Sequence, residues 1–450
     1  SSDNKSLIEI LPSYLPDNIF IIFSSRPSNP DINPLKGREY FESYTLKADS
    51  KENKEDAYAF TEKHLKGYAS KERIRSITDK ARWNFLFLKM LCKAITEDNY
   101  PLEEAENFLN NDENLQGWYL NYWERLHLNF AEDADKLEDF SNIIGVVAAA
   151  KEAVSNTMIC ECLAMSPFRF EWSMRYIGQY FDIIPVSEKG VENEGQTIAY
   201  FYRLYHYSFA EFVEKKIFKN LRYFHKRWAK YLSEWENMEG YESSYAIRML
   251  AYHLYATGNS KDLYKTITNI HYLNACGMEG RHFEMLRYWK DFDEKDIISK
   301  LLKGFENLLS GMETEQRMVY SSGLHLGELL QHIGHYSEAL HIYSQAKDFI
   351  DDGNKSAMSE ILFAQGWCYR HIDRFDEAIE KFHEALILFE AMDNEPGMAK
   401  TWSTIGINQW QKYEDMKAIE SIQKSLDIYE KTANKKASAE AHNHMGIILR

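Results

Sequence analysis

The stretch "GWCYRHIDRFDEAIEKFHEAL" (residues 366–386) decides the fold of the C-terminal third of the chain. Its glycine belongs to a series, Gly327, Gly366, Gly406 and Gly446, whose members stand at nearly equal intervals along the sequence. Self-similarity at a period of this size is typical of proteins that stack pairs of helices. The spacing therefore predicts an α-solenoid over residues 313–450.

Small residues recur at two fixed offsets after each of the first three glycines. Ala339, Ala378 and Ala418 stand at the first offset, and Ala346, Ala385 and Ser425 stand at the second. Small side chains at these points let two antiparallel helices approach closely, and we expect Tyr343, Phe382 and Ile422 to fill the space between units.

Gly366, Tyr369, Ala378 and Phe382 follow the order of a tetratricopeptide repeat, which this unit resembles. The period exceeds the usual ~34 residues, so we expect slightly longer helices. Three full units and the first helix of a fourth are visible, and we expect the repeats to continue past Arg450.

The composition indicates a mainly α protein of several domains. A chain of 450 residues is too long for one core, and only 21 glycines and 9 prolines leave few helix breakers. The net charge of −16 argues against a general nucleic-acid surface, and the absence of a run of ~20 apolar residues argues against a membrane span. Five scattered cysteines indicate reduced thiols in a cytoplasmic protein. Cys160 and Cys162 lack a second pair at zinc spacing, so we expect no metal site.

Helical periodicity dominates the part of the chain that precedes the repeats. It runs over residues 56–95, where 81–95 reads as one apolar helix, and over 115–133. Three short helices are then expected at 137–149, 155–164 and 168–180. They precede two apolar runs, "YFDIIPV" and "TIAYFYRLYH", in the order of a winged-helix domain. The polar loop between the runs contains one lysine, Lys189, and three glutamates, Glu188, Glu192 and Glu194. Such a loop would repel phosphate, so we expect a packing module that does not bind DNA.

Several catalytic motifs are missing from these residues. The sequence contains no G-x-x-x-x-G-K-[ST] loop, no H-E-x-x-H helix and no G-x-S-x-G elbow. Four histidines are scattered around the expected repeat helices, where we predict solvated or partner-facing positions. They are His325, His332, His335 and His341.

Two residues stand at the ends of predicted strands. "IFIIFSSRPSNP" (residues 19–30) predicts a buried strand that Pro27 and Pro30 terminate, with Arg26 at its C-terminal end. His206 lies in "LYHYSFAEFVEKK", between the last strand and the following helix. Taken singly, Arg26 can be a solvated loop charge and His206 a satisfied core histidine.

The order of these elements resembles the later part of the nucleotide switch of STAND ATPases, the NACHT and NB-ARC families. "LPSYLPDNIFIIFSSRP" is similar to their sensor-1 strand, "RWNFLFLKMLCKAI" to the lid helix over the adenine, and "YHYSFAEFV" to the histidine that ends the winged helix. "LQGWYLNYWERL" looks like the landmark between lid and winged helix. Where the lid motif usually carries a glycine and a proline, this chain has residues 82–85, "RWNF".

The resemblance implies five regions. They are the C-terminal part of an α/β nucleotide-binding domain (1–50), a helical lid (51–134), a winged helix (135–219), a helical connector (220–312) and tetratricopeptide repeats (313–450). The P-loop and the magnesium carboxylates would precede Ser1, so we expect the chain to be a segment of a longer protein.

The resemblance also implies a nucleotide site. Arg26, with Ser25 beside it, would contact or sense the γ-phosphate of ATP, and His206 would reach the β-phosphate of ADP. Asn84 and Phe85 would lie at the adenine, and Mg²⁺ would be held by residues outside this segment. The full-length protein would then be an ATPase with a separate effector, although this segment contains no P-loop and no catalytic carboxylates.

Three functions are compatible with the sequence. The first is a STAND signalling switch whose repeats bind a protein ligand, for example a phage protein in bacterial antiviral defence, and which forms a homo-oligomer when ATP replaces ADP. The second is a transcription regulator of the same architecture that senses a small inducer. The third is a passive repeat scaffold without a nucleotide.

Overall fold

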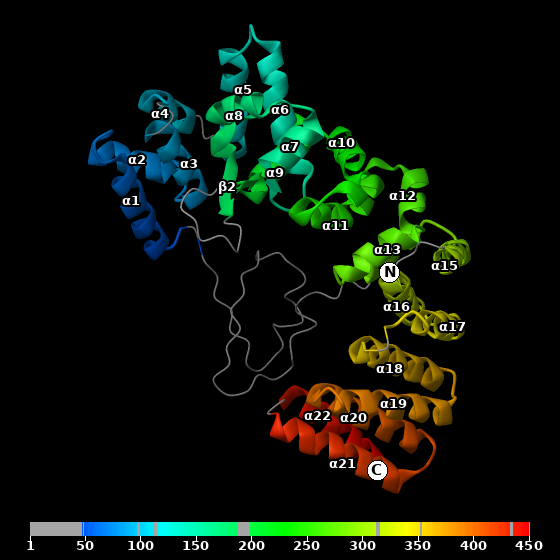
Figure 1. The fold of residues 1–450 in the computed structure, drawn as a ribbon. Coiled ribbons are helices and arrows are strands. Elements are labelled where there is room, and N and C mark those ends of the chain that lie inside the picture. Colours follow the sequence, from blue (N-terminus) through cyan, green and yellow to red (C-terminus); the bar gives the residue numbers. More distant parts are fainter. Residues whose placement is uncertain are drawn as a thin grey trace, which may run out of the picture. The chain divides into compact units, whose positions relative to one another are not determined.

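The computed structural model describes residues 47, 49–96, 100–110, 115–186, 199–311, 316–351, 353–432 and 435–449, and these form mostly helices (Figure 1). The predicted strand at 19–30, with Ser25 and Arg26, and the loop at 187–196 lie outside the described residues. The chain divides into two compact units, residues 1–132 and 133–450, and each is described by itself. Within the described residues no helix combines the length and apolarity that a membrane crossing requires.

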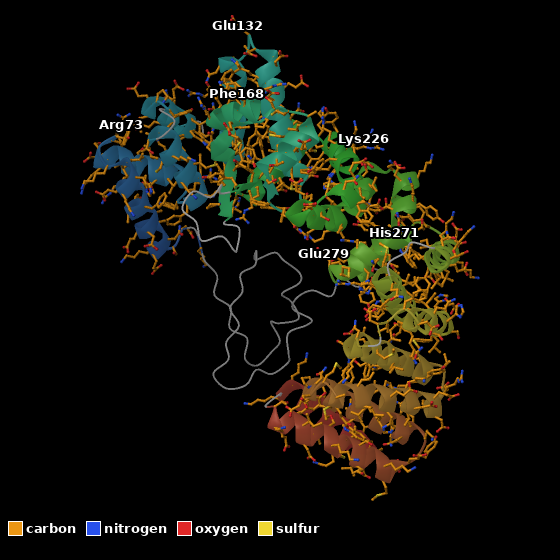
Figure 2. All side chains as sticks on the ribbon, viewed as in Figure 1. Arg73, Glu132, Phe168, Lys226, His271 and Glu279 are labelled. Carbon is orange, nitrogen blue, oxygen red and sulfur yellow. The ribbon has the colours of Figure 1, made fainter. Side chains whose placement is uncertain are left out.

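The first unit is helical. Its helices are α1 (Lys51–Leu65), α2 (Lys71–Lys80), α3 (Phe85–Thr96), α4 (Leu102–Asn110) and α5 (Leu115–Asn129). The buried indole of Trp118 forms the centre, with the rings of Phe87, Tyr100 and Phe108 at 5.9, 5.0 and 5.2 Å between centroids. Arg73, labelled in Figure 2, donates two hydrogen bonds of 2.8 and 2.6 Å to the carboxylate of Glu106 and so joins α2 to α4.

The apolar helix predicted at 81–95 begins later than expected, at Phe85. Arg82 and Trp83 both adopt positive φ, 54° and 53°, which interrupts the helical backbone. The side chain of Asn84 then accepts a hydrogen bond from the backbone N–H of Phe87 at 3.1 Å and caps the new helix.

The second unit begins with three helices and a small sheet. The helices are α6 (Ala134–Ala149), α7 (Asn156–Leu163) and α8 (Pro167–Ile177). The strands are β1 (Val154–Ser155), β2 (Phe181–Val186) and β3 (Ala199–Leu204), all antiparallel in the order β1-β3-β2, with Phe181 opposite Leu204. Both predicted strands are therefore present, while the winged-helix assignment of residues 135–219 stays a prediction.

A helical connector follows. After α9 (Tyr207–Phe212), which still belongs to the region 135–219, the connector comprises α10 (Arg222–Leu232), α11 (Gly240–Thr257), α12 (Ser260–Ile267), α13 (Ile270–Met278), α14 (Leu286–Trp289) and α15 (Glu294–Ser310). Trp228 of α10 is buried and donates from its indole N–H to the carbonyl of Val146 in α6 at 2.9 Å. Arg248 of α11 pairs with Glu152 at 2.7 Å, so side chains of the connector bind directly to the preceding helices.

Two buried histidines meet between α10 and α11. The Nδ1 atoms of His225 and His253 are 2.9 Å apart, so one ring donates to the other while both are neutral. Burial lowers the pKa of His225 to about 4 and the pKa of His253 well below its ordinary value, and the charge of Lys151 lowers both further. The connector core is thus built around neutral imidazoles.

The repeats form helical pairs. The pairs are α16 (Gln316–His332) with α17 (Tyr336–Lys347), α18 (Lys355–His371) with α19 (Phe375–Glu390), and α20 (Glu395–Gln411) with α21 (Asp415–Lys431), followed by α22 (Lys435–Ile448). The predicted α-solenoid is confirmed. Helices α18, α20 and α21 each contain 17 residues and α19 contains 16, which accounts for the long period.

The two helices of each pair approach each other closely at the glycine of the first helix. A Cβ atom at Gly366 would lie 2.6 Å from Cε1 of Phe382, and one at Gly327 would lie 2.3 Å from Cε1 of Tyr343. A Cβ atom at Gly406 would lie 2.8 Å from Cδ1 of Ile422. These are the large side chains that the spacing predicts between helices, and any residue other than glycine would overlap them.

The turn inside each pair requires a left-handed residue at one equivalent position. Gly334, Asp373 and Tyr413 occupy it with φ of 89°, 59° and 62°. Glycine adopts this conformation freely, whereas tyrosine does so at a cost of about 1 kcal/mol. The ring of Tyr413 is 93% exposed, so the third turn holds an aromatic side chain in solvent.

We expect Gly366→Ala to destabilise the repeats by about 1–3 kcal/mol, because the added methyl overlaps the ring of Phe382. Gly446→Ala is the matched control, since a Cβ there has no neighbour within 4 Å among the described residues, and this helical glycine should gain about 0.5–1 kcal/mol on substitution. Urea unfolding of both variants measures the difference. Equal effects of the two substitutions would contradict the close approach.

We expect the free energy of unfolding to fall as the pH drops from 7 to 5. The unfolded chain protonates His225 and His253 near pH 6.5, whereas burial lowers the pKa of His225 to about 4 in the folded chain and that of His253 well below its ordinary value, so the unfolded state binds more protons. The loss for His225 is on the order of 2 kcal/mol at pH 5, and His253 adds to it in the same direction. Chemical denaturation across this pH range measures it.

The double variant His225→Phe/His253→Leu should show a shallower pH dependence, whatever its stability at pH 7. The exposed His442 is the control, and His442→Gln should retain the wild-type slope. An unchanged slope in the double variant would mean that the pair does not carry the acid sensitivity.

Candidate functional site

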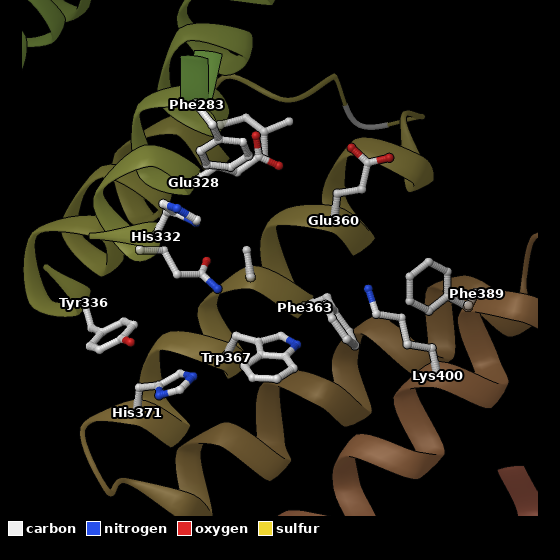
Figure 3. Close-up of a pocket in the computed structure, with 14 residues that line it drawn as sticks. Phe283, Glu328, His332, Tyr336, Glu360, Phe363, Trp367, His371, Phe389 and Lys400 are labelled. Atoms are coloured by element: carbon white, nitrogen blue, oxygen red, sulfur yellow. The ribbon is translucent and has the colours of Figure 1, made fainter. Parts of the chain in front are cut away.

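A cavity of about 530 Å³ opens along the first helices of the repeat pairs, and we call it the groove (Figure 3). Helices α16, α18 and α20 supply most of its lining, and the connector adds one aromatic residue. The residues drawn and labelled in Figure 3 are Phe283, Glu328, His332, Tyr336, Glu360, Phe363, Trp367, His371, Phe389 and Lys400. The groove thus combines aromatic rings with charges of both signs.

Three rings form a stack at one end of the groove. Tyr336 and His371 lie parallel, with centroids 4.6 Å apart and an interplanar angle of 5°, and Trp367 lies 5.5 Å from His371 at 21°. Trp367 and His371 are one helical turn apart on α18 and therefore share a helix face. Burial, with the nearby charge of Arg370, lowers the pKa of His371, so the stack contains a neutral imidazole at pH 7.

Two cations of the groove region lie against aromatic faces. The ammonium of Lys400 is 4.4 Å from the ring centroid of Phe363, and the guanidinium of Arg370 is 4.9 Å from that of Trp367. Partial desolvation at these rings lowers the pKa of both groups, although Lys400 as a residue remains exposed. Arg370 also donates to Oε1 of Gln411 at 3.2 Å, whereas Lys400 lines the groove and would gain from an acidic partner.

Acidic side chains also line the groove. Glu360 accepts a hydrogen bond from the Tyr320 hydroxyl at 3.4 Å, and Glu328 lies 3.1 Å from Nε2 of the buried His282. His282 belongs to the connector, in the 3₁₀ helix His282–Met285. Its neighbour Phe283 is 41% exposed and packs on His332, with centroids 4.8 Å apart.

The histidines of α16 divide between the core and the groove. The expectation of solvated or partner-facing positions is wrong for His325, which is buried and hydrogen-bonded to Asn274 Oδ1 at 3.0 Å. Its ring packs where Gly277 of α13 leaves room, because a Cβ there would lie 2.1 Å from the ring. Burial lowers the pKa of His325 to about 4. His332, in contrast, is exposed and lines the groove.

The repeat period identifies the groove positions in the sequence. Glu360 and Lys400 are separated by one repeat and occupy the same place in successive units, as His332 and His371 do. The first of these positions changes from glutamate to lysine between units, whereas the second holds histidine in both units and the glycine positions stay constant. The constant positions predict the fold, whereas Trp367, Phe363 and Lys400 were not predicted as site residues.

The predicted lid residues lie in the first unit. Asn84 is exposed and caps α3, and Phe85 is 38% exposed, with its ring 5.7 Å from that of Phe60. The preceding turn is fixed by Trp83, whose indole N–H donates to Asp79 at 3.0 Å and whose carbonyl accepts from Asn53 at 3.3 Å. This turn contains the two positive φ angles in the stretch where the lid motif usually carries a glycine.

His206 lies in the second unit and caps α9. Its Nδ1 accepts the backbone N–H of Ser208 at 3.1 Å and lies 2.8 Å from the hydroxyl of the same residue. Because Nδ1 accepts, the proton of the neutral ring is on Nε2, which has no partner in the described part of the chain. The ring is exposed, so His206 is not a core histidine, and it presents one N–H donor to solvent.

The cysteines form no cluster with other ligands. Burial raises the pKa of the Cys160 thiol to about 11 and that of Cys162 to about 12. Among the described residues, no three histidine, cysteine or acidic side chains are arranged to hold a metal ion.

Comparison with known proteins identifies one repeat. The family model of the tetratricopeptide repeat matches residues 359–391, which cover most of α18 and all of α19 and include Phe363, Trp367 and His371. No curated protein sequence matches the chain.

Two solved structures are similar in outline. One is a Signal Transduction ATPase with Numerous Domains (STAND) protein with a tetratricopeptide repeat sensor from Pyrococcus horikoshii, at 13% identity and a TM-score of 0.34, over 88% of this chain. The chain spans 62% of the length of that protein. The other is BtubC (BKLC) from P. vanneervenii, at 12% identity and a TM-score of 0.30, over 50% of this chain and 89% of that one. Scores this low support no assignment, so the proposals below rest on the residues of this chain.

Proposed function

We propose that the repeats are the sensor of a nucleotide-dependent signalling switch, and that the groove binds a segment of a protein ligand. The observation that carries the proposal is the groove itself, an open cavity lined by Trp367, Phe363 and the partly desolvated Lys400. Aromatic residues and arginine dominate the energetics of protein interfaces, and a groove along stacked helical repeats is the surface such arrays use for binding.

The charges of the groove define the ligand segment. Lys400 lines the groove and lies on the ring of Phe363, so a carboxylate of the ligand would compensate the ammonium charge that burial leaves poorly solvated. The stack of Tyr336, His371 and Trp367 offers a flat apolar surface for an adjacent aromatic or aliphatic side chain. We therefore expect a segment that carries an acidic residue next to an apolar one.

The groove is physically continuous with the connector. Glu328 lines the groove and contacts His282, and exposed Phe283 belongs to the same 3₁₀ helix. A ligand that binds Glu328 or Phe283 would change the contacts of this helix and so bias the connector. This is the route by which occupation of the repeats would reach the rest of the switch.

The nucleotide part of the proposal rests on sequence order and on His206. The Nε2–H donor of His206 is exposed and suits a phosphate oxygen, and Ser25, Arg26, Asn84 and Phe85 would complete the ATP or ADP site. Mg²⁺ would be held by residues outside this segment. The bound nucleotide supplies the two states between which the switch changes.

The finer assignments belong to the same proposal. A STAND switch of the NACHT or NB-ARC type in the cytoplasm would form a homo-oligomer when ATP replaces ADP and would activate a separate effector. A phage protein is one ligand that such a switch would sense. A transcription regulator would instead sense a small inducer, and a passive scaffold would bind the ligand without nucleotide dependence.

We expect Trp367→Ala/Lys400→Glu to abolish peptide binding in the groove. Peptides selected from a random display library on the purified chain serve as the probe, and we expect the selected sequences to pair acidic with apolar residues. The double variant should weaken their affinity at least about tenfold in fluorescence anisotropy, because it removes a stacking surface and reverses a charge. The matched control is Lys424→Glu, a lysine that lies 4.4 Å from Trp402 but does not line the groove. Peptides that bind the double variant as well as the wild type would exclude the groove.

We expect His206→Ala to lower the amount of ADP that co-purifies with the complete gene product, or to cause activation without ligand. Arg26→Ala should impair activation, because it removes the guanidinium that would contact the γ-phosphate. Nucleotide content by chromatography and a signalling assay measure the two effects, with His442→Ala as control. Unchanged ADP content and signalling in both variants would contradict the nucleotide switch and leave the sensor proposal standing.

A further inference from the structure

A second cavity, of about 700 Å³, lies in the connector between α10, α11, α12 and α13, and we call it the connector pocket. It is larger than the groove and within the range of ~300–1,000 Å³ that small-molecule sites occupy. Its apolar wall consists of residues that are themselves buried, Leu250, Leu254 and Tyr272. The wall is therefore part of the connector core.

Lysines line the polar side of the connector pocket. Lys226, labelled on α10 in Figure 2, and Lys230 are one turn apart on the same helix, and Lys265 comes from α12. In the described part of the chain none of the three ammonium groups has an ion pair or a hydrogen bond. Like charges one turn apart on a helix repel each other, so this arrangement favours binding of an anion.

The neutral groups of the connector pocket also present donors. The side-chain oxygen of Asn269 accepts the backbone N–H groups of His271 and Tyr272 at 2.8 and 3.3 Å, which leaves its amide N–H₂ without a partner in the described residues. The indole N–H of Trp235 is likewise unpartnered there. A ligand rich in acceptor oxygens satisfies this set.

The indole of Trp235 provides a flat surface. It is partly exposed, and its ring packs against buried Tyr272 with centroids 5.6 Å apart at 73°. This contact fixes the indole, and its exposed part stays available for a planar ring. Two carboxylates also line the pocket. Asp262 is bound by the Asn259 amide at 2.6 Å, and Glu236 can accept a hydrogen bond from a ligand hydroxyl or amino group.

We infer that the connector pocket binds a nucleoside phosphate, with the phosphate at the three lysines and the base on Trp235. The phosphate supplies the acceptors and the charge, the base supplies the planar ring, and its amino group or the ribose supplies a donor for Glu236. His206, which is proposed for the switch nucleotide, is not among the residues that line this pocket. Occupation of the pocket would stabilise the packing of α10 against α12 and α13 in the part of the chain that joins the winged-helix region to the repeats.

Isothermal titration of the chain with the four common ribonucleoside monophosphates tests this inference. EDTA is present throughout, because lysine contacts need no magnesium. We expect at least one nucleotide to bind at one site per chain, more tightly than inorganic phosphate or the free nucleoside. Lys226→Gln/Lys265→Gln should weaken this binding at least about tenfold.

Two further variants separate the connector pocket from other sites. Trp235→Leu should weaken the nucleotide but leave inorganic phosphate unaffected, and Lys261→Gln, on α12 but outside the lining, should change neither. Arg26→Ala/His206→Ala should also leave binding intact. The inference is overturned if no nucleotide binds, if Lys226→Gln/Lys265→Gln binds as the wild type does, or if a hexaglutamate peptide binds in place of the nucleotides.

Discussion

The close approach of two helices at a glycine is the contact on which the repeats depend. The ring of Phe382 packs directly against Gly366, in the space that a Cβ atom would fill, and the ring of Tyr343 packs against Gly327 in the same way. Successive residues of a helix point about 100° apart. The glycine that faces the second helix therefore places the next residue, Trp367, on a different face, where it lines the groove. Core packing and the lining of the groove are thus fixed by neighbouring positions.

The same contact joins the repeats to the connector. Gly277 of α13 admits the ring of His325 from α16, just as the repeat glycines admit aromatic rings from their partner helices. His325 stays neutral because it is buried, and Oδ1 of Asn274 accepts its hydrogen bond. Beside it, His282 meets Glu328 of the groove wall. The first repeat and the connector therefore share one polar core.

The sequence predicted those parts of the fold that follow from periodicity, and it failed where tertiary contacts decide. The glycine interval gives the helical pairs and the Gly366–Phe382 contact, because both recur at a fixed spacing. The groove was not predicted, because Lys400 and Trp367 can be recognised as lining residues of one cavity only when the fold brings successive repeats side by side. Helix α3 begins late because Arg82 and Trp83 adopt positive φ angles, and neither arginine nor tryptophan indicates such an angle in a sequence. The buried state of His325 depends on Gly277, which lies on another helix much earlier in the chain.

Hydrogen exchange of the chain, with and without a protein ligand or a peptide that it binds, tests the central claim that the groove is the sensor surface. The account predicts that binding slows exchange in α16, α18 and α20, which line the groove, and in the 3₁₀ helix His282–Met285. The second helices α19 and α21 should change little. Protection confined to α19 and α21, or ligand binding without protection in α18, would contradict it.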